Sequence, residues 1–113
     1  MAANGFMAEV RLMGEVAVLD LAGDLDGTAE KLLNEAWEAV GDAPIVVLNF
    51  SAASYINSTG IALIVGILGR ARVEKRVVRA FGLTDHYREI FEITRLSDFI
   101  EIHNNENQAT ANP

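Results

Sequence analysis

The chain has 113 residues, half of them hydrophobic, and contains no cysteine. This length fits one domain over residues 1–113, and the absence of thiols excludes a disulfide framework or a thiolate metal site. A formal net charge of −7 repels phosphate backbones and anionic lipids, which argues against a nucleic-acid-binding or membrane-binding protein. Because the N-terminus lacks the basic and long apolar segments of a signal peptide, we expect a cytoplasmic protein.

The first two predicted elements are strands. Residues 8–13 alternate apolar and polar side chains, as a half-exposed strand does, and residues 16–22 are almost continuously apolar. Between them, Gly14-Glu15 is typical of a hairpin with a type II′ turn. The two strands are therefore predicted to be antiparallel neighbours.

After this hairpin, helical and strand patterns alternate along the chain. The expected elements are a turn over 23–28, a helix over 29–40, a strand over 45–50, a loop over 51–54, a helix over 60–73, a strand over 77–81, a helix over 85–94 and a strand over 99–102. Strands joined through a helix run parallel and need a right-handed crossover.

This order, ββαβαβαβ, predicts an α/β fold. We expect a single domain in which a mixed, mostly parallel sheet carries an N-terminal antiparallel hairpin and is flanked by α-helices. Residues 1–7 and 104–113 are expected to be loose termini, although 106–111 could form a helical turn. There are no internal repeats.

A polar turn opens the central helix. Asn57, Ser58 and Thr59 have side-chain oxygens of the kind that accept hydrogen bonds from the free N–H groups at a helix start. The helix is therefore predicted to begin at about Gly60. Its two hydroxyl groups then lie at the positive end of the helix dipole.

The same helix is apolar on two sides. One stripe is predicted to be buried, whereas Leu63 and Ile67 form a second apolar ridge. This ridge is either covered by another element or open to a partner, which could be a second copy of the chain in a homodimer. The residues of the stripe predicted to be buried are Ile61, Ile64, Val65 and Leu68.

Charged residues cluster at two places. Five of the nine basic residues lie within residues 70–79, where they suit the negative end of the helix dipole or could bind an acidic partner. Asp24 and Asp26 could form a carboxylate pair for acid–base chemistry. One residue apart in a turn, they more often form the turn and cap the next helix, and we favour that interpretation.

No catalytic constellation is predicted. His86 and His103 lie far apart without a carboxylate cluster, so no metal site is expected, and Ser58 lacks the G-x-S-x-G pattern of a hydrolase. No sequence pattern requires a cofactor. What remains is a hydroxyl group at a helix start. Its phosphorylation would add about −1.5 to −2 charge, which the fold tolerates but a partner packed over it does not.

Three segments resemble a known family. The segment Leu21-Ala22-Gly23-Asp24-Leu25-Asp26 is similar to a G-[ED]-L-D turn, and Asn57-Ser58-Thr59-Gly60-Ile61 is similar to a D-S-[ST]-G-[LI] motif, with the strand Val46-Val47-Leu48-Asn49-Phe50 between them. In this order and spacing, the chain resembles the bacterial anti-sigma-factor antagonists, which are small single-domain members of the STAS family. One departure is Asn57, where the family most often has Asp.

The resemblance implies a non-enzymatic partner switch. The unmodified protein would bind an anti-sigma factor that is an ATP-dependent serine kinase, and so free the sigma factor. The kinase would phosphorylate Ser58, with Thr59 as the second candidate, and a PP2C-type phosphatase would reverse this. The alternative is a constitutive STAS interaction module in a signalling scaffold or transporter complex. The implied docking surface consists of Asp24, Asp26, Asn57, Ser58, Thr59, Gly60, Leu63 and Ile67.

Overall fold

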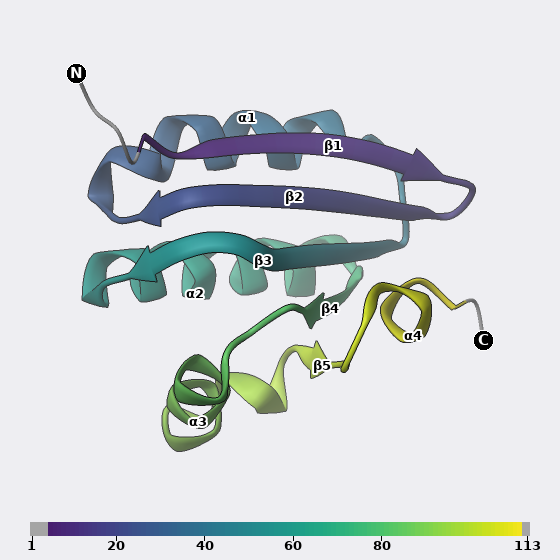
Figure 1. Ribbon diagram of the computed structural model, residues 1–113. Coiled ribbons are helices and arrows are strands. Elements are labelled where there is room, and N and C mark those ends of the chain that lie inside the picture. The colour runs from purple at the N-terminus through teal and green to yellow at the C-terminus, as the bar shows by residue number, and fades with distance from the viewer. Residues whose placement is uncertain (1–4, 112–113) are drawn as a thin grey trace.

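The computed structural model describes residues 5–111 and folds them into one five-stranded sheet with helices on both faces (Figure 1). The order of the strands across the sheet equals their order along the chain, and only the first pair is antiparallel. The predicted α/β fold, with its hairpin and parallel remainder, is confirmed. The strands are β1 (Met7–Met13), β2 (Val16–Leu25), β3 (Ile45–Ile56), β4 (Val77–Phe81) and β5 (Glu101–Ile102).

Helices follow β2, β3, β4 and β5. Two short 3₁₀ turns accompany them: η1 (Gly27–Ala29) precedes the first helix, and η2 (Leu96–Asp98) follows the third. None of the helices in the described part of the chain is long and apolar enough to cross a membrane. The helices are α1 (Glu30–Ala39), α2 (Ser58–Glu74), α3 (Asp85–Ile93) and α4 (Glu106–Thr110).

The hairpin turn has the geometry that its sequence predicts. Gly14 has a φ of +66°, whereas the φ of Glu15 is not positive. A positive φ at only the first central residue fits a type II′ turn, whose twist matches that of the flanking strands.

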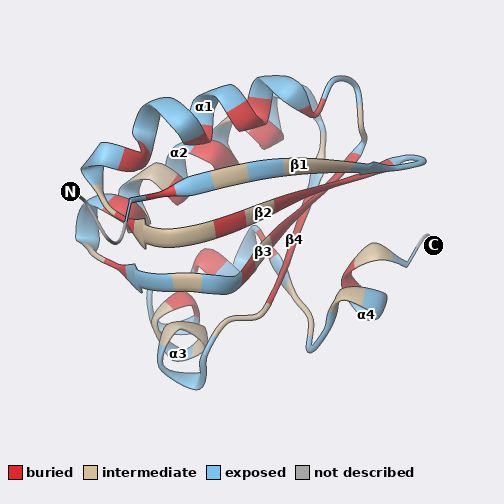
Figure 2. Cartoon of the chain, turned by 45° about the horizontal axis from the view of Figure 1, so that its top comes forward, coloured by how far each residue is buried: buried red, intermediate tan, exposed pale blue. Residues whose placement is uncertain are grey.

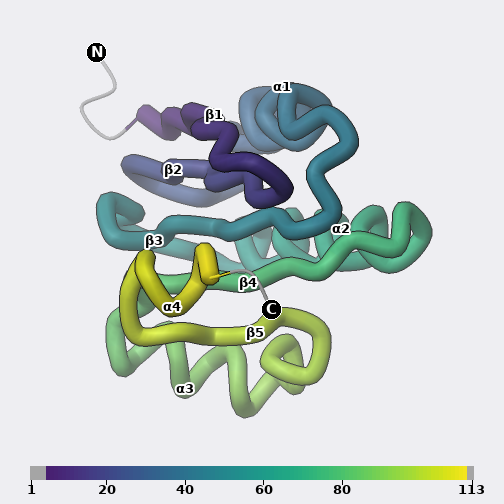
Figure 3. Tube along the Cα trace, turned by 90° about the vertical axis from the view of Figure 1, so that its right-hand side faces the viewer, coloured from purple at the N-terminus to yellow at the C-terminus, as the bar shows by residue number. Residues whose placement is uncertain are grey.

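The main core lies between the sheet and helices α1, α2 and α3. Leu19 and Leu48 of the central strands pack in it with Trp37, Ile64 and Phe91 of the three helices. The opposite face of β2, β3 and β4 holds a smaller cluster under α4, which is visible in front of the sheet in Figure 3. Because both faces are covered, buried residues are concentrated in the central strands (Figure 2). The smaller cluster consists of Val16, Val18, Ile45, Val47, Phe81 and Ala109.

Strand β3 is longer than its sequence suggests. Residues 51–54, predicted as a loop, continue the strand to Ile56; Ala52 and Ala53 pair with the end of β2, and a register shift lies on either side of them. The prediction failed because these residues are small and mostly exposed, so the ladder of backbone hydrogen bonds rather than apolar burial holds them in the sheet. This extension brings Leu25 opposite Ile56, at the entrance to α2.

The C-terminal region differs from its prediction in two ways. Only Glu101–Ile102 of the predicted strand 99–102 pairs with β4, since Phe99 ends the turn η2. Within the tail that was expected to be loose from residue 104, the alternative of a helical turn over 106–111 is the correct one, because residues 106–110 form α4, whose Ala109 is fully buried. At the other end, the expectation of a loose terminus over residues 1–7 is wrong for Phe6, which is buried in the core, and for Met7, which begins β1. Residues 1–4 and 112–113 of the predicted loose termini lie outside the described residues.

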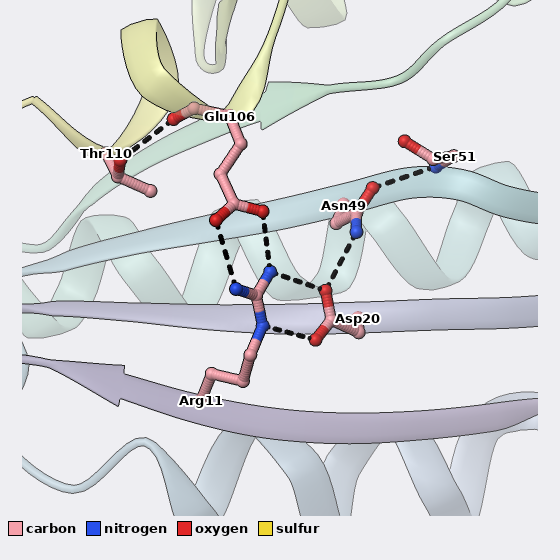
Figure 4. A network of polar contacts seen from close by, with 6 residues as sticks. All are labelled: Arg11, Asp20, Asn49, Ser51, Glu106 and Thr110. Atoms are coloured by element: carbon pink, nitrogen blue, oxygen red, sulfur yellow. Dashed lines mark hydrogen bonds and ion pairs between the residues drawn. The ribbon is translucent and has the colours of Figure 1, made fainter.

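A polar network fastens α4 to the sheet (Figure 4). The Arg11 guanidinium donates to both carboxylate oxygens of Glu106 at 2.8 and 3.0 Å and to both of Asp20 at 2.6 and 2.9 Å. Asn49 donates to Asp20 at 2.8 Å. Hydrogen bonds from Arg11 lower the pKa values of the Asp20 and Glu106 carboxyl groups, so both favour the ionised form.

Candidate partner-binding site at the start of helix α2

Ser58 is the first residue of α2, and its side chain is exposed. The side chain of Asn57 caps the helix, because its Oδ1 accepts a hydrogen bond from the Gly60 N–H at 2.8 Å. The predicted cap is therefore confirmed, but the helix begins two residues before the predicted Gly60. Ser58 and Thr59 lie in its first turn, and both are exposed.

The backbone of this first turn lies directly against the end of β2. Gly60 is buried, and a Cβ atom added to it would lie 1.9 Å from the Leu25 carbonyl oxygen. The same carbonyl oxygen accepts a hydrogen bond from the Asn57 N–H at 3.3 Å. Since only glycine leaves room for this approach, the packing fixes where the helix starts.

The acidic turn after β2 lies beside the same helix turn. A Cβ atom added to Gly27 would lie 3.3 Å from Thr59 Cγ2. Asp26 caps η1 by accepting hydrogen bonds from the Thr28 N–H at 2.9 Å and from its hydroxyl at 2.5 Å, and these bonds lower the pKa of the Asp26 carboxyl group. Asp24 is half-buried nearby in β2. The interpretation of Asp26 as a cap is confirmed.

Helix α3 supports the strand that leads to Ser58. The Tyr87 hydroxyl accepts a hydrogen bond from the Ile56 N–H at 3.0 Å. Thr84 caps this helix, because its hydroxyl oxygen accepts a hydrogen bond from the Tyr87 N–H at 3.3 Å. This role of Tyr87 was not predicted from the sequence. The available signal was its hydroxyl group, which needs a polar partner when the ring is partly buried.

The predicted apolar ridge of α2 is not open to a partner. Ile67 is only 2% exposed and Leu63 is half-buried against the core, whereas Val65, predicted to be buried, is 49% exposed. The contact of Gly60 with β2 sets the rotation of the helix, so Ile67 continues the buried stripe that Gly60 and Ile64 begin. The exposed face of α2 consists of Ser58, Thr59, Ala62, Val65, Gly66, Gly69, Arg72 and Val73.

Most of the predicted basic cluster is engaged within the domain. Arg70 pairs with Glu38, and Arg76 donates to two carbonyl oxygens of the loop after α1. Arg79 is buried and donates to carbonyl oxygens at the end of α4. The exposed members are Arg72 and Lys75. Most of the cluster therefore connects secondary-structure elements within the domain, and only its exposed members remain available to a partner.

The comparisons with known proteins agree with this fold. A family model for the STAS domain matches residues 7–109. The anti-sigma-B factor antagonist of Listeria monocytogenes is 34% identical over 94 residues, which cover 81% of this chain and 82% of the relative.

Two solved structures share the fold. An anti-sigma factor antagonist from Mycobacterium paratuberculosis superposes with a TM-score of 0.80 at 19% identity, covering 96% of this chain and 93% of that one. The Bacillus cell fate determinant SpoIIAA in its phosphorylated form gives a TM-score of 0.68 at 20% identity, covering 92% and 96%. At these identities the two structures show the common architecture alone. Together with the family model and the Listeria relative, the ββαβαβαβα topology establishes that this chain belongs to the STAS domain family.

Proposed function

We propose that this protein is an anti-sigma-factor antagonist that acts by partner switching in the cytoplasm. Its unmodified form binds an anti-sigma factor that is a serine kinase, and phosphorylation of Ser58 abolishes this binding. The observation that carries the proposal is the exposed Ser58 hydroxyl on a capped helix start, in a relative of an anti-sigma-B factor antagonist. Thr59, exposed in the same turn, is the second candidate for modification.

The geometry suits a modification that leaves the fold intact. The Asn57 side chain accepts a hydrogen bond from the Gly60 N–H, and the positive end of the α2 dipole lies at Ser58. A phosphate at such a helix start meets free N–H groups and a favourable field. Because Ser58 is exposed, the added group needs no space inside the core.

The same modification opposes a docked partner. A partner packed over Ser58 would bury a dianion, which costs several kcal/mol without a counter-charge. The ionised Asp26 beside the helix start adds negative charge to this surface. Since each 1.4 kcal/mol is about tenfold in affinity, phosphorylation should act as an off-switch for binding. The protein is then the substrate and binding partner of its regulators, which would include a PP2C-type phosphatase.

Site mapping and binding together test the proposal. The protein is incubated with the purified anti-sigma-factor kinase of its own genome and ATP, and intact mass and peptide mapping locate the phosphate. We expect one phosphate at Ser58, none in Ser58→Ala, and removal by a PP2C-type phosphatase. Binding of the kinase should be unchanged in Ser58→Ala and at least about tenfold weaker in Ser58→Asp.

A charge-matched control distinguishes an effect of charge at Ser58 from an effect of the protein's overall net charge. Asn34→Asp places the same added charge on an exposed position of α1, and should leave kinase binding unchanged. If Ser58→Asp binds as tightly as Asn34→Asp and neither Ser58 nor Thr59 takes up phosphate, the switch is refuted. That result would favour the constitutive STAS interaction module of a scaffold or transporter complex.

A further inference from the structure

An apolar groove lies between the C-terminal half of α2 and the segment that follows α3. It has a volume of about 350 Å³, and a second hollow of about 170 Å³ shares Leu68, Arg72 and Phe99 with it. Leu68 and Leu96 are buried residues of its lining. The complete lining of the larger groove is Val65, Leu68, Gly69, Arg72, Thr94, Arg95, Leu96 and Phe99.

The groove exposes large apolar side chains. Phe99 is 55% exposed and Val65 is 49% exposed, and both line the same hollow. Single exposed apolar residues are ordinary, but two that line one concave site are typical of an interaction surface. Aromatic residues and arginine are also the residue types that contribute most to binding at protein interfaces.

Arginine side chains line the groove from two elements. The Arg72 guanidinium lies 5.8 Å from the centre of the Phe99 ring, and within residues 5–111 it forms no ion pair with a carboxylate. Arg95 comes from the start of η2, and its exposed side chain pairs with Asp98 three residues later. Its φ of +66° lies in the left-handed region, as is common for the residue that follows the end of a helix.

We propose that this groove binds an acidic, amphipathic segment of a partner protein. One bulky apolar side chain of the segment enters between Val65 and Phe99, and two of its carboxylates pair with Arg72 and Arg95. Two guanidinium groups on separate elements suit a peptide with several carboxylates better than a fatty acid, which has one.

The groove lies on the same side of α2 as Ser58. Val65 follows Ser58 by about two helical turns, and Arg72 follows Val65 by two more, which places the groove on the order of 10–20 Å from Ser58 along the helix. The exposed face between them contains Ala62 and Gly66, which leave α2 without bulky side chains there. One partner could therefore reach both places. The binding of a segment in the groove does not depend on the chemistry of Ser58.

A selection with randomised short peptides displayed on phage tests this inference. The full-length protein is the bait, and peptides that also bind Phe99→Ala are removed. We expect the enriched peptides to combine several Asp or Glu residues with a large apolar residue. Such a peptide should bind Arg72→Glu at least about tenfold more weakly than the unchanged protein. A version of the peptide with its Glu residues replaced by Lys should show a similar loss of affinity for the unchanged protein.

A neighbouring substitution is the control. Val73→Ala removes a side chain that is 83% exposed and outside the lining, so the affinity for the peptide should stay within about twofold. The inference is overturned if no peptide is enriched, if the enriched peptides lack acidic residues, or if the Glu→Lys version binds equally well. Full displacement of the peptide by palmitate would also overturn it and assign the groove to a fatty acid. Neither kinase nor Ser58 takes part, so failure here leaves the proposed function untouched.

Discussion

Replacing Gly60 by alanine should disrupt the contact that positions the start of α2. The added Cβ atom would lie 1.9 Å from the Leu25 carbonyl oxygen and 2.8 Å from its carbonyl carbon. Cβ contacts are essentially never shorter than 3.0 Å, so helix and strand must separate by about 1.1 Å. The atoms met are backbone, and they cannot rotate away as a flexible side chain could.

The change in the free energy of unfolding caused by Gly60→Ala is the sum of two opposed effects. Overpacking of this kind costs about 1–3 kcal/mol, and a contact with backbone belongs at the upper end of that range. Alanine in place of glycine inside a helix returns about 1 kcal/mol. We therefore expect a net loss of about 2 kcal/mol in the free energy of unfolding, which lowers the Tm of a domain of this size by roughly 8 °C.

Gly66→Ala is the matched control for this experiment. Gly66 lies in the same helix, and a Cβ atom added to it meets nothing within 4 Å. This variant should gain up to about 1 kcal/mol, because only the helix propensity changes. Calorimetry and urea unfolding of both variants give the comparison. If Gly60→Ala is as stable as Gly66→Ala, α2 does not start in contact with Leu25, and the described geometry of the site is wrong.

The remaining predictions concern the cap and the polar network. Asn57→Ala should lose about 1 kcal/mol of stability in urea unfolding, since the Gly60 N–H loses its acceptor, whereas Asn57→Asp should keep the cap and be at least as stable as the unchanged protein. Arg11→Met should lose about 1 kcal/mol at pH 7 and weaken the hydrogen-exchange protection of α4. In the folded state Asp20 and Glu106 have pKa values lowered from 3.8 and 4.5, so their contribution is complete above about pH 5 and is lost as the pH falls through the lowered values. The stability difference between Arg11→Met and the unchanged protein should therefore shrink towards pH 2, and a difference of constant size would contradict the network.

The features predicted best from the sequence are those that depend on interactions between neighbouring residues. The predictions of the cap at Asn57 and of the glycine turn of the hairpin were correct, because each depends on hydrogen bonds or a φ value within a few residues. Periodicity also located the buried strands β2 and β3, whose apolar runs reflect cover on both faces. These features need no knowledge of distant segments.

Features that depend on distant segments were missed. Helix α2 is apolar on more than one side, so its spacing could not decide between Ile67 and Val65 as the buried residue, and the approach of Gly60 to β2 made that choice. The support of Ile56 by Tyr87 joins residues 31 positions apart. The groove beside Phe99 forms only when the segment after α3 packs near the end of α2. Such contacts leave no periodic trace in the sequence.

The sequential arrangement of the strands has a consequence for biosynthesis. Each new strand pairs with the one made just before it, so the sheet can assemble progressively while the polypeptide leaves the ribosome. The ion pair between Arg11 and Glu106 joins residues 95 positions apart and has to wait for the last helix. Until α4 emerges, the nascent sheet exposes Val18, Val47 and Phe81 to solvent, which leaves it open to aggregation. The smaller core is thus protected only once α4 has packed against the sheet.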